Sequence, residues 1–227
     1  MKYAVVPDIA TIAGSIGNPA RSRIVLALMA GRALTATELS LEAEISPSTA
    51  SAHLSKLCGV GLIRRRKQGR HRYFEIAGEQ VAEIIEKLCV LANRTAPGVA
   101  SGPSDSALRK ARVCYDHLAG ELGVRLFEGL VGQGLLELHG DGVDLTPAGE
   151  QRLDEFGIDV RQLLDARRTV CRSCLDWSVR RSHLAGGAGA AILRQIYQRR
   201  WAEKDLIGRT VRFSASGERE FVRFFGI

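Results

Sequence analysis

Three cysteines and two histidines in the second half of the chain have the side chains and spacings of ligands for a soft metal ion. Cys114 and His117 lie three residues apart, which would place them on one face of a helix, and Cys171-x-x-Cys174 has the spacing of a chelating pair. If the two segments meet, these four side chains would form a Cys3His site, with His183 as a substitute ligand. Such a set suits Zn(II), and three thiolates also suit a trivalent arsenic species or another thiophilic ion.

The same side chains also fit packing or redox chemistry. A single Cys-x-x-Cys is a weaker zinc signal than a pair of such motifs, so structural packing is a competing interpretation. Cys58 and Cys89 fit as small buried apolar residues. Redox switching is a further alternative because nearby cations favour the thiolate form, and three arginines flank the cysteine pair: Arg167, Arg168 and Arg172.

Two other functions remain open for the second half. It could be a thiol oxidoreductase in which Cys171 attacks and Cys174 resolves, although the charged segment 165–170 lacks the buried strand expected before a thioredoxin-like motif. It could also bind a small organic ligand through aromatic side chains, which are Tyr115, Trp177 and Trp201. No phosphate-cradling glycine loop or Ser/His/Asp arrangement is recognisable, so we expect no enzymatic activity.

An internal repeat indicates which elements position these residues. His-Leu-Ala-Gly begins at both His117 and His183, and the pattern of residues 143–150 recurs at the matching place farther on. We therefore predict two degenerate copies, at about 110–158 and 176–227. Each copy is expected to contain helices, a short hairpin and a further helix, which is the order of a winged-helix half without a basic face.

The first half contains a candidate DNA-reading helix over residues 46–59. Ser46 is placed to cap it and Pro47 suits its first turn, while Leu54 and Leu57 face inward. Small and polar side chains face outward and let the helix enter a major groove. We expect DNA contacts from Ser46, Ser48, Thr49, Ser51, His53 and Lys56.

A basic hairpin with its turn at Gln68-Gly69 follows this helix directly. The usual alternative for a run of charges is a solvated loop, but this order of elements predicts a winged helix-turn-helix whose cations grip phosphates. The residues concerned are Arg64, Arg65, Lys67, Arg70, His71 and Arg72.

Together with helix-forming segments at 18–28 and 34–39, the sequence from Ser51 to Leu57 resembles the ArsR/SmtB family of bacterial repressors over about the first 95 residues. The resemblance implies a homodimer in which residues 78–94 supply a dimer helix, and a repressor that binds near-palindromic double-stranded DNA until an inducer releases it. Longer ArsR-like regulators resemble the whole arrangement, including the Cys-Tyr-Asp-His-Leu-Ala-Gly and Cys-Leu-Asp-Trp segments.

The metal sites usual in that family are not carried over. The helix before the reader has no thiol at residues 38–42, and the predicted dimer helix has Glu83 and Glu86 but no histidine. We therefore expect the signal to be sensed in the second half, through a thiophilic metal ion, thiol modification or a small organic ligand.

Composition fits a two-domain intracellular regulator. The chain has 227 residues, 45% of them hydrophobic, and a net charge of +7; residues 1–95 hold 13 basic and 8 acidic side chains. No signal peptide or membrane-spanning run is recognisable, so a cytoplasmic location is expected. We predict a mainly α fold with small β-hairpins (α+β), with a winged helix-turn-helix over 1–95, a Pro- and Gly-rich linker over 96–105 and a sensor domain over 106–227.

Overall fold

The computed structural model describes residues 8–95, 103, 105–140, 142–205 and 208–227. The chain divides into two compact units, Met1–Ala82 and Glu83–Ile227. The division lies inside a helix, α5 (Glu79–Thr95), and precedes the predicted linker at 96–105, nearly all of which is outside the described residues. Helices joined by short antiparallel hairpins make up both units, so the predicted fold class is confirmed.

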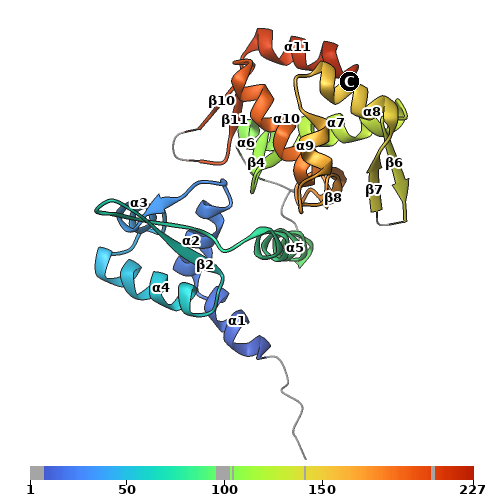
Figure 1. The fold of residues 1–227 in the computed structure, drawn as a ribbon. Coiled ribbons are helices and arrows are strands. Elements are labelled where there is room, and N and C mark those ends of the chain that lie inside the picture. Colours follow the sequence, from blue (N-terminus) through green and yellow to red (C-terminus); the bar gives the residue numbers. More distant parts are fainter. Residues whose placement is uncertain (1–7, 96–102, 104, 141, 206–207) are drawn as a thin grey trace, which may run out of the picture. The chain divides into compact units, whose positions relative to one another are not determined.

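Unit 1 is a winged helix-turn-helix (Figure 1). Its three-stranded antiparallel sheet has the order β1-β3-β2. The helices bury Ile24, Leu39 and Leu57 in a shared core. The elements are α1 (Ile9–Ile16), α2 (Pro19–Leu28), β1 (Leu34–Thr35), α3 (Ala36–Glu42), α4 (Pro47–Gly59), β2 (Ile63–Gln68) and β3 (His71–Ile76).

Local sequence determines where these helices begin and end. The Ser46 hydroxyl accepts a hydrogen bond from the Thr49 backbone N–H, and Pro47 occupies the first turn of α4, as predicted. Thr35 and Glu38 form a complete capping box at the start of α3. After α4 the chain turns at Gly61, whose φ of +72° is readily available only to glycine.

Unit 2 contains the same order of elements twice, hairpin, helix, hairpin and helix. Copy 1 runs β4 (Arg112–Cys114), β5 (His117–Ala119), α7 (Glu121–Gly132), β6 (Leu136–His139), β7 (Gly142–Leu145) and α8 (Pro147–Glu155). Copy 2 runs β8 (Arg172–Leu175), β9 (Ser182–Ala185), α10 (Gly186–Gln198), β10 (Ala202–Lys204), β11 (Val211–Phe213) and α11 (Ala215–Phe225). Two short helices, α6 (Ser106–Lys110) and α9 (Val160–Leu164), precede the copies.

These boundaries differ from the prediction in two ways. Each copy starts with a hairpin rather than a helix, and copy 2 starts with β8 at Arg172 rather than at 176. The His-Leu-Ala-Gly motif therefore forms the second strand of the opening hairpin and the entry to the following helix.

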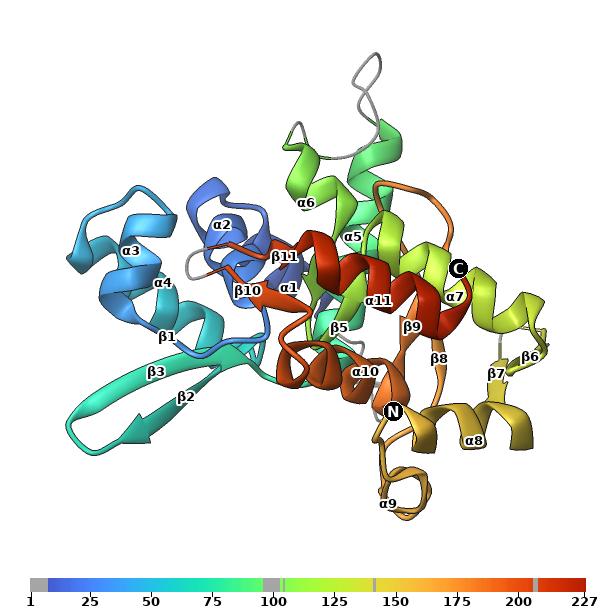
Figure 2. The ribbon, with the colours of Figure 1, turned by 90° about the horizontal axis from the view of Figure 1, so that it is seen from above.

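The two copies pack reciprocally. Helix α7 of copy 1 lies against β9 of copy 2, and α10 of copy 2 lies against β5 of copy 1. Each helix also lies close to the hairpin of its own copy: a Cβ at Gly123 would lie 2.5 Å from the Leu118 carbonyl oxygen, and one at Gly189 would lie 2.3 Å from the Leu184 oxygen, so glycine is needed at both equivalent positions. Helix α11 packs on α7 and contributes Phe221 to the core that both copies share (Figure 2).

Candidate nucleic-acid interface and metal centre

The outward face of α4 offers hydroxyls and one amine. Ser48, Ser51 and Lys56 are exposed. The Ser46 hydroxyl, also exposed, lies 3.0 Å from the Ser48 hydroxyl and 2.8 Å from that of Thr49. These groups surround the helix N-terminus, where backbone N–H groups and the helix dipole favour a phosphate.

His53 differs from the other predicted contacts because it is half-buried. Its Nδ1 lies 3.4 Å from Nη1 of Arg21, whose guanidinium also donates to the backbone oxygens of Ser15 and Gly14. Burial, with the charges of Arg21 and Lys56, lowers the pKa of His53, so the imidazole is neutral near pH 7. Arg21, which the sequence analysis did not single out, therefore ties the reading helix to α1.

The hairpin β2–β3, called the wing below, carries the predicted cations. All six of them are exposed: Arg64, Arg65, Lys67, Arg70, His71 and Arg72. Lys67 lies directly opposite Arg72 in the ladder, an arrangement that like charges disfavour unless an anion lies between them. The wing can therefore bind phosphate along both strands.

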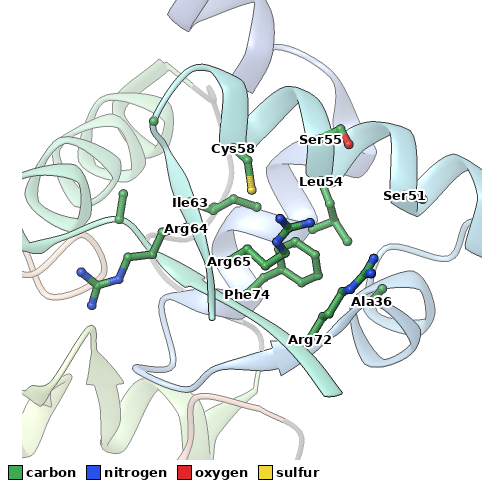
Figure 3. Close-up of a pocket in the computed structure, with 12 residues that line it drawn as sticks. Ala36, Ser51, Leu54, Ser55, Cys58, Ile63, Arg64, Arg65, Arg72 and Phe74 are labelled. Atoms are coloured by element: carbon green, nitrogen blue, oxygen red, sulfur yellow. The ribbon is translucent and has the colours of Figure 1, made fainter. Parts of the chain in front are cut away.

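A groove of about 680 Å³ lies between α4 and the wing (Figure 3). Ser51 and Leu54 line one wall, and Arg65 and Arg72 line the other. Arg64 points away from α4 and forms an ion pair of 2.8 Å with Glu75. Cations on the groove side are thus the ones best placed beside a nucleic-acid backbone.

In unit 2, the opening hairpins of the two copies bring two cysteines and two histidines together. Cys114 pairs with His117 across β4–β5, and Cys174 pairs with His183 across β8–β9. The predicted helical arrangement of Cys114 and His117 is wrong because a tight turn, with Tyr115 at a φ of +60°, reverses the chain between them. Side chains directly opposite in a hairpin point to the same face, so each pair offers two donors in one direction.

The four donor atoms of this Cys2His2 cluster (Cys114, His117, Cys174 and His183) all lie within 4.8 Å of one another. The two Sγ atoms are 4.0 Å apart and the two Nε2 atoms 3.2 Å apart. A tetrahedral zinc ion with ordinary bond lengths separates two sulfurs by about 3.8 Å and two imidazole nitrogens by about 3.3 Å. The cluster therefore has nearly the spacing of zinc ligands.

The cluster is buried and the thiols differ in acidity. Cys114, His117 and His183 are at most 2% exposed, and Cys174 is half-buried. The hydrogen bond from Cys114, together with those from the two imidazoles, holds the pKa of the Cys174 thiol far below its usual value. The same contact and burial raise the pKa of Cys114. Cys174 is therefore the more acidic of the two thiols.

Each histidine has an aspartate of its own copy behind it. His117 Nδ1 lies 3.2 Å from Asp116, which Arg168 also contacts; burial alone would lower the pKa of His117, but Asp116 and Cys174 raise it to about 9. His183 Nδ1 lies 4.0 Å from Asp176 and has no hydrogen-bond partner among the described residues. Carboxylates in this position orient imidazole ligands toward a metal.

Asp176 is itself held in place by several donors. It pairs with the buried Arg112 at 2.7 Å and accepts hydrogen bonds from the backbone N–H groups of Gly120 and Ser178. Burial opposes ionisation, but Arg112 and these donors keep the pKa of Asp176 below its usual range. Copy 2 therefore supplies the carboxylate that anchors the start of α7 in copy 1.

The structure does not place Cys171 among the cluster residues. Cys171 lies in the apolar core, so the prediction that it belongs to a Cys3His set is wrong. Burial there raises the pKa of Cys171 to about 12. His183 takes its place as a full member. The high pKa of Cys171 also disfavours an attacking thiol at this position.

Two of the three aromatic side chains predicted to bind an organic ligand, Trp177 and Trp201, are engaged in packing. Trp177 stacks under the Arg112 guanidinium at 4.8 Å, and Trp201 packs on Phe156. A cavity of about 240 Å³ does lie beside Cys174, lined by Glu83, Glu86 and residues of β8. Of the four residues Cys114, His117, Cys174 and His183, Cys174 is the one that lines this cavity.

The sequence analysis did not identify Asp116 and Asp176 as partners of the two histidines, or Arg112 as the partner of Asp176, although the sequence contains a signal for them. Arg-x-Cys-x-Asp occurs at Arg112–Asp116 and again at Arg172–Asp176. Residues 177–182 separate the second occurrence from its His-Leu-Ala-Gly motif, whereas in copy 1 the motif follows at once.

Comparisons with known proteins agree with the fold of unit 1. A helix-turn-helix domain model matches residues 16–66. The uncharacterized HTH-type transcriptional regulator YdfF of Bacillus subtilis is 37% identical and the match covers 97% of this chain and 98% of that protein. The HTH-type transcriptional regulator Rv0324 of Mycobacterium tuberculosis is 31% identical over 53% of this chain and 56% of its own length.

Solved structures match part of the chain. The homodimeric winged helix-turn-helix domain of Mb0332 from Mycobacterium bovis, described as a possible ArsR-family transcriptional regulator, is 27% identical, covers 40% of this chain and 91% of its own, and gives a TM-score of 0.36. Within the described residues, no helix combines the length and apolarity needed to span a membrane.

Proposed function

The chain belongs to the helix-turn-helix transcriptional regulators, and we propose that it is an ArsR-like, cytoplasmic repressor that binds a near-palindromic operator as a homodimer. The observation that carries this proposal is the pairing of α4, with its exposed hydroxyls, and the wing, with its exposed cations, on the two sides of one groove. In such a reader α4 enters the major groove and the wing holds the backbone beside it.

Dimerisation is supported by the surface of α5. Ile84, Leu88 and Leu91 recur at helical spacing and are 52%, 40% and 56% exposed. An apolar stripe of this kind is suited to burial against a second copy of the same helix. A dimer would present two copies of α4 to successive major grooves.

The proposed input to this reader is the Cys2His2 cluster of unit 2. Thiols and imidazoles bind thiophilic ions, and none of the cluster residues belongs to unit 1. Loading of the cluster would then change the operator affinity of the dimer, which gives release on induction.

The experiment is a set of binding titrations on DNA selected from a random duplex pool. Ser51→Ala should weaken binding to the selected operator more than binding to unrelated DNA, because Ser51 lies on the exposed face of α4. Arg65→Ala should weaken both equally, because phosphate contacts carry no sequence information. If the pool yields no preferred sequence, or if Arg65→Ala changes only the preference, the proposal is wrong.

Dimer state is tested by sedimentation of Leu88→Glu beside Leu138→Glu, which alters an exposed leucine of β6. The first variant should become monomeric and lose operator affinity, whereas the second should behave like the parent. If Leu88→Glu remains dimeric, α5 is not part of the dimer interface.

A further inference from the structure

We propose that Cys114, His117, Cys174 and His183 bind one Zn(II) ion in a closed tetrahedral site that joins the two copies of unit 2. Each copy contributes one thiol and one imidazole from its opening hairpin. The proposal identifies the ion at the input of the proposed function, but its site would exist whether or not the ion controls DNA binding.

The donor atoms already converge. The described hydrogen-bond partners of both Sγ atoms and both Nε2 atoms are other members of the cluster. Two buried imidazole nitrogens facing each other at 3.2 Å must share a proton or bind a common cation. A Zn(II) ion would take the place of that proton and satisfy all four donors at once.

Charge and donor type select the ion. Two thiolates and one divalent cation sum to zero, so the loaded site can remain buried without an unpaired charge. Mg²⁺ and Ca²⁺ require oxygen ligands, whereas Cys2His2 sets with tetrahedral spacing are typical of structural zinc sites.

The surroundings fit a zinc site as well as the donors do. Asp116 lies 3.2 Å from His117 Nδ1 and can accept a hydrogen bond from it, on the side away from the ion. Asp176 lies 4.0 Å from His183 Nδ1, close enough for charge attraction but not for a hydrogen bond. The Cβ of His183 lies near Gly123 at the start of α7, and that of His117 lies near Gly189 at the start of α10. An ion held by both hairpins would therefore fix the contact between each hairpin and the other copy's helix.

The site also has a route for the ion. The cavity beside Cys174 is lined by the carboxylates of Glu83 and Glu86. Lys87 and Arg172 also line this cavity and pair with Glu83, so its charges are balanced. An ion entering there would reach the half-buried Cys174 first, while the other three ligands remain covered.

The test is the zinc content of the full chain, purified under reducing conditions without chelator, by elemental mass spectrometry. One Zn(II) per chain is expected, and X-ray absorption at the zinc edge should fit two sulfur and two nitrogen neighbours. Cys114→Ser and His183→Gln should lose the ion, whereas the matched control Cys171→Ala should keep it because Cys171 lies outside the cluster.

Asp116→Asn keeps all four ligands and should weaken zinc binding about 10- to 100-fold in competition with a chromophoric chelator. If the ligand variants do not fold, cobalt(II) substitution of the parent protein still tests the site. Tetrahedral Co(II) with thiolate ligands has intense visible absorption, so this absorption is expected. A metal-free protein, an octahedral cobalt spectrum, or a Cys114–Cys174 disulfide under these reducing conditions would overturn the proposal.

Operator affinity of the zinc-loaded and zinc-free parent separates this proposal from the preceding one. If zinc binds as described but the operator affinity is the same with and without zinc, the zinc site is confirmed and its proposed sensing role is refuted. A change in affinity on zinc addition that persists in Cys114→Ser would place the sensor elsewhere.

Discussion

The reader of unit 1 and the first copy of unit 2 each contain a helix followed by an antiparallel hairpin, but their hairpins carry opposite charges. In the wing, Lys67 faces Arg72 across the ladder. In β6–β7, which follows α7, Glu137 faces Asp144, with His139 near both. The order of elements therefore does not by itself make a DNA reader; the sign of the charge on the hairpin does.

The arginines of the two units differ in the same way. Arg64 of the wing pairs with Glu75 while its side chain is 62% exposed, whereas Arg112 of unit 2 pairs with Asp176 with side chains only 1% and 0% exposed. An exposed guanidinium remains available to a phosphate, but a buried one serves the fold.

Breaking the buried ion pair should have the largest effect on stability. Asp176→Ala leaves the Arg112 guanidinium buried without its carboxylate and should lower the free energy of unfolding by about 3–5 kcal/mol in urea denaturation. The matched variant Glu75→Ala, which removes the partner of exposed Arg64, should cost about 1 kcal/mol or less. Equal losses in the two variants would refute the distinction between the units.

Filling the close contact between α10 and the opening hairpin of its own copy should have the next largest effect. A Cβ in Gly189→Ala would lie 2.3 Å from the Leu184 backbone oxygen and should cost about 1–3 kcal/mol through overpacking. Gly132→Ala, at the end of α7, meets nothing within 4 Å and should be neutral or slightly stabilising in the same denaturation experiment. A neutral Gly189→Ala would show that α10 does not pack on β9 as closely as described.

Removing a helix cap in unit 1 should have the smallest effect. Thr35→Ala removes the capping box of α3 and should cost about 1 kcal/mol near pH 7. Hydrogen bonds from the backbone and hydroxyl of Thr35 lower the pKa of Glu38 in the folded state, so this contribution is present above the unfolded-state pKa and is lost as the pH falls through the folded-state value.

Denaturation of Thr35→Ala and the parent at neutral and acidic pH measures this dependence. The difference between them should shrink on acidification. A difference that grows as the pH falls would assign the cap another role.

Helix α4 and the wing of unit 1 could be predicted from the sequence because the residues that determine them act locally. The cap at Ser46, the first-turn Pro47 and the run of cations after α4 each act within a few residues. Arg21 could not be identified as a partner of His53, because their contact depends on how two helices pack.

The cluster was only partly predictable. The residue types in the second half indicated soft-ligand chemistry, but a spacing of three between Cys114 and His117 fits both a helical face and a two-residue hairpin turn. Only the strand register places His183 beside Cys174 and leaves Cys171 in the core. Aligning the two Arg-x-Cys-x-Asp motifs would have paired the correct residues.

The salt dependence of DNA binding tests the central claim, that exposed charge on the wing makes unit 1 the reader. The measurement compares the parent with Arg65→Ala/Arg70→Ala and with the control Arg161→Ala/Arg219→Ala, which removes two exposed arginines of unit 2. The slope of log K against log salt should become shallower by about two in the wing variant and stay unchanged in the control. Equal changes in both variants would contradict the account.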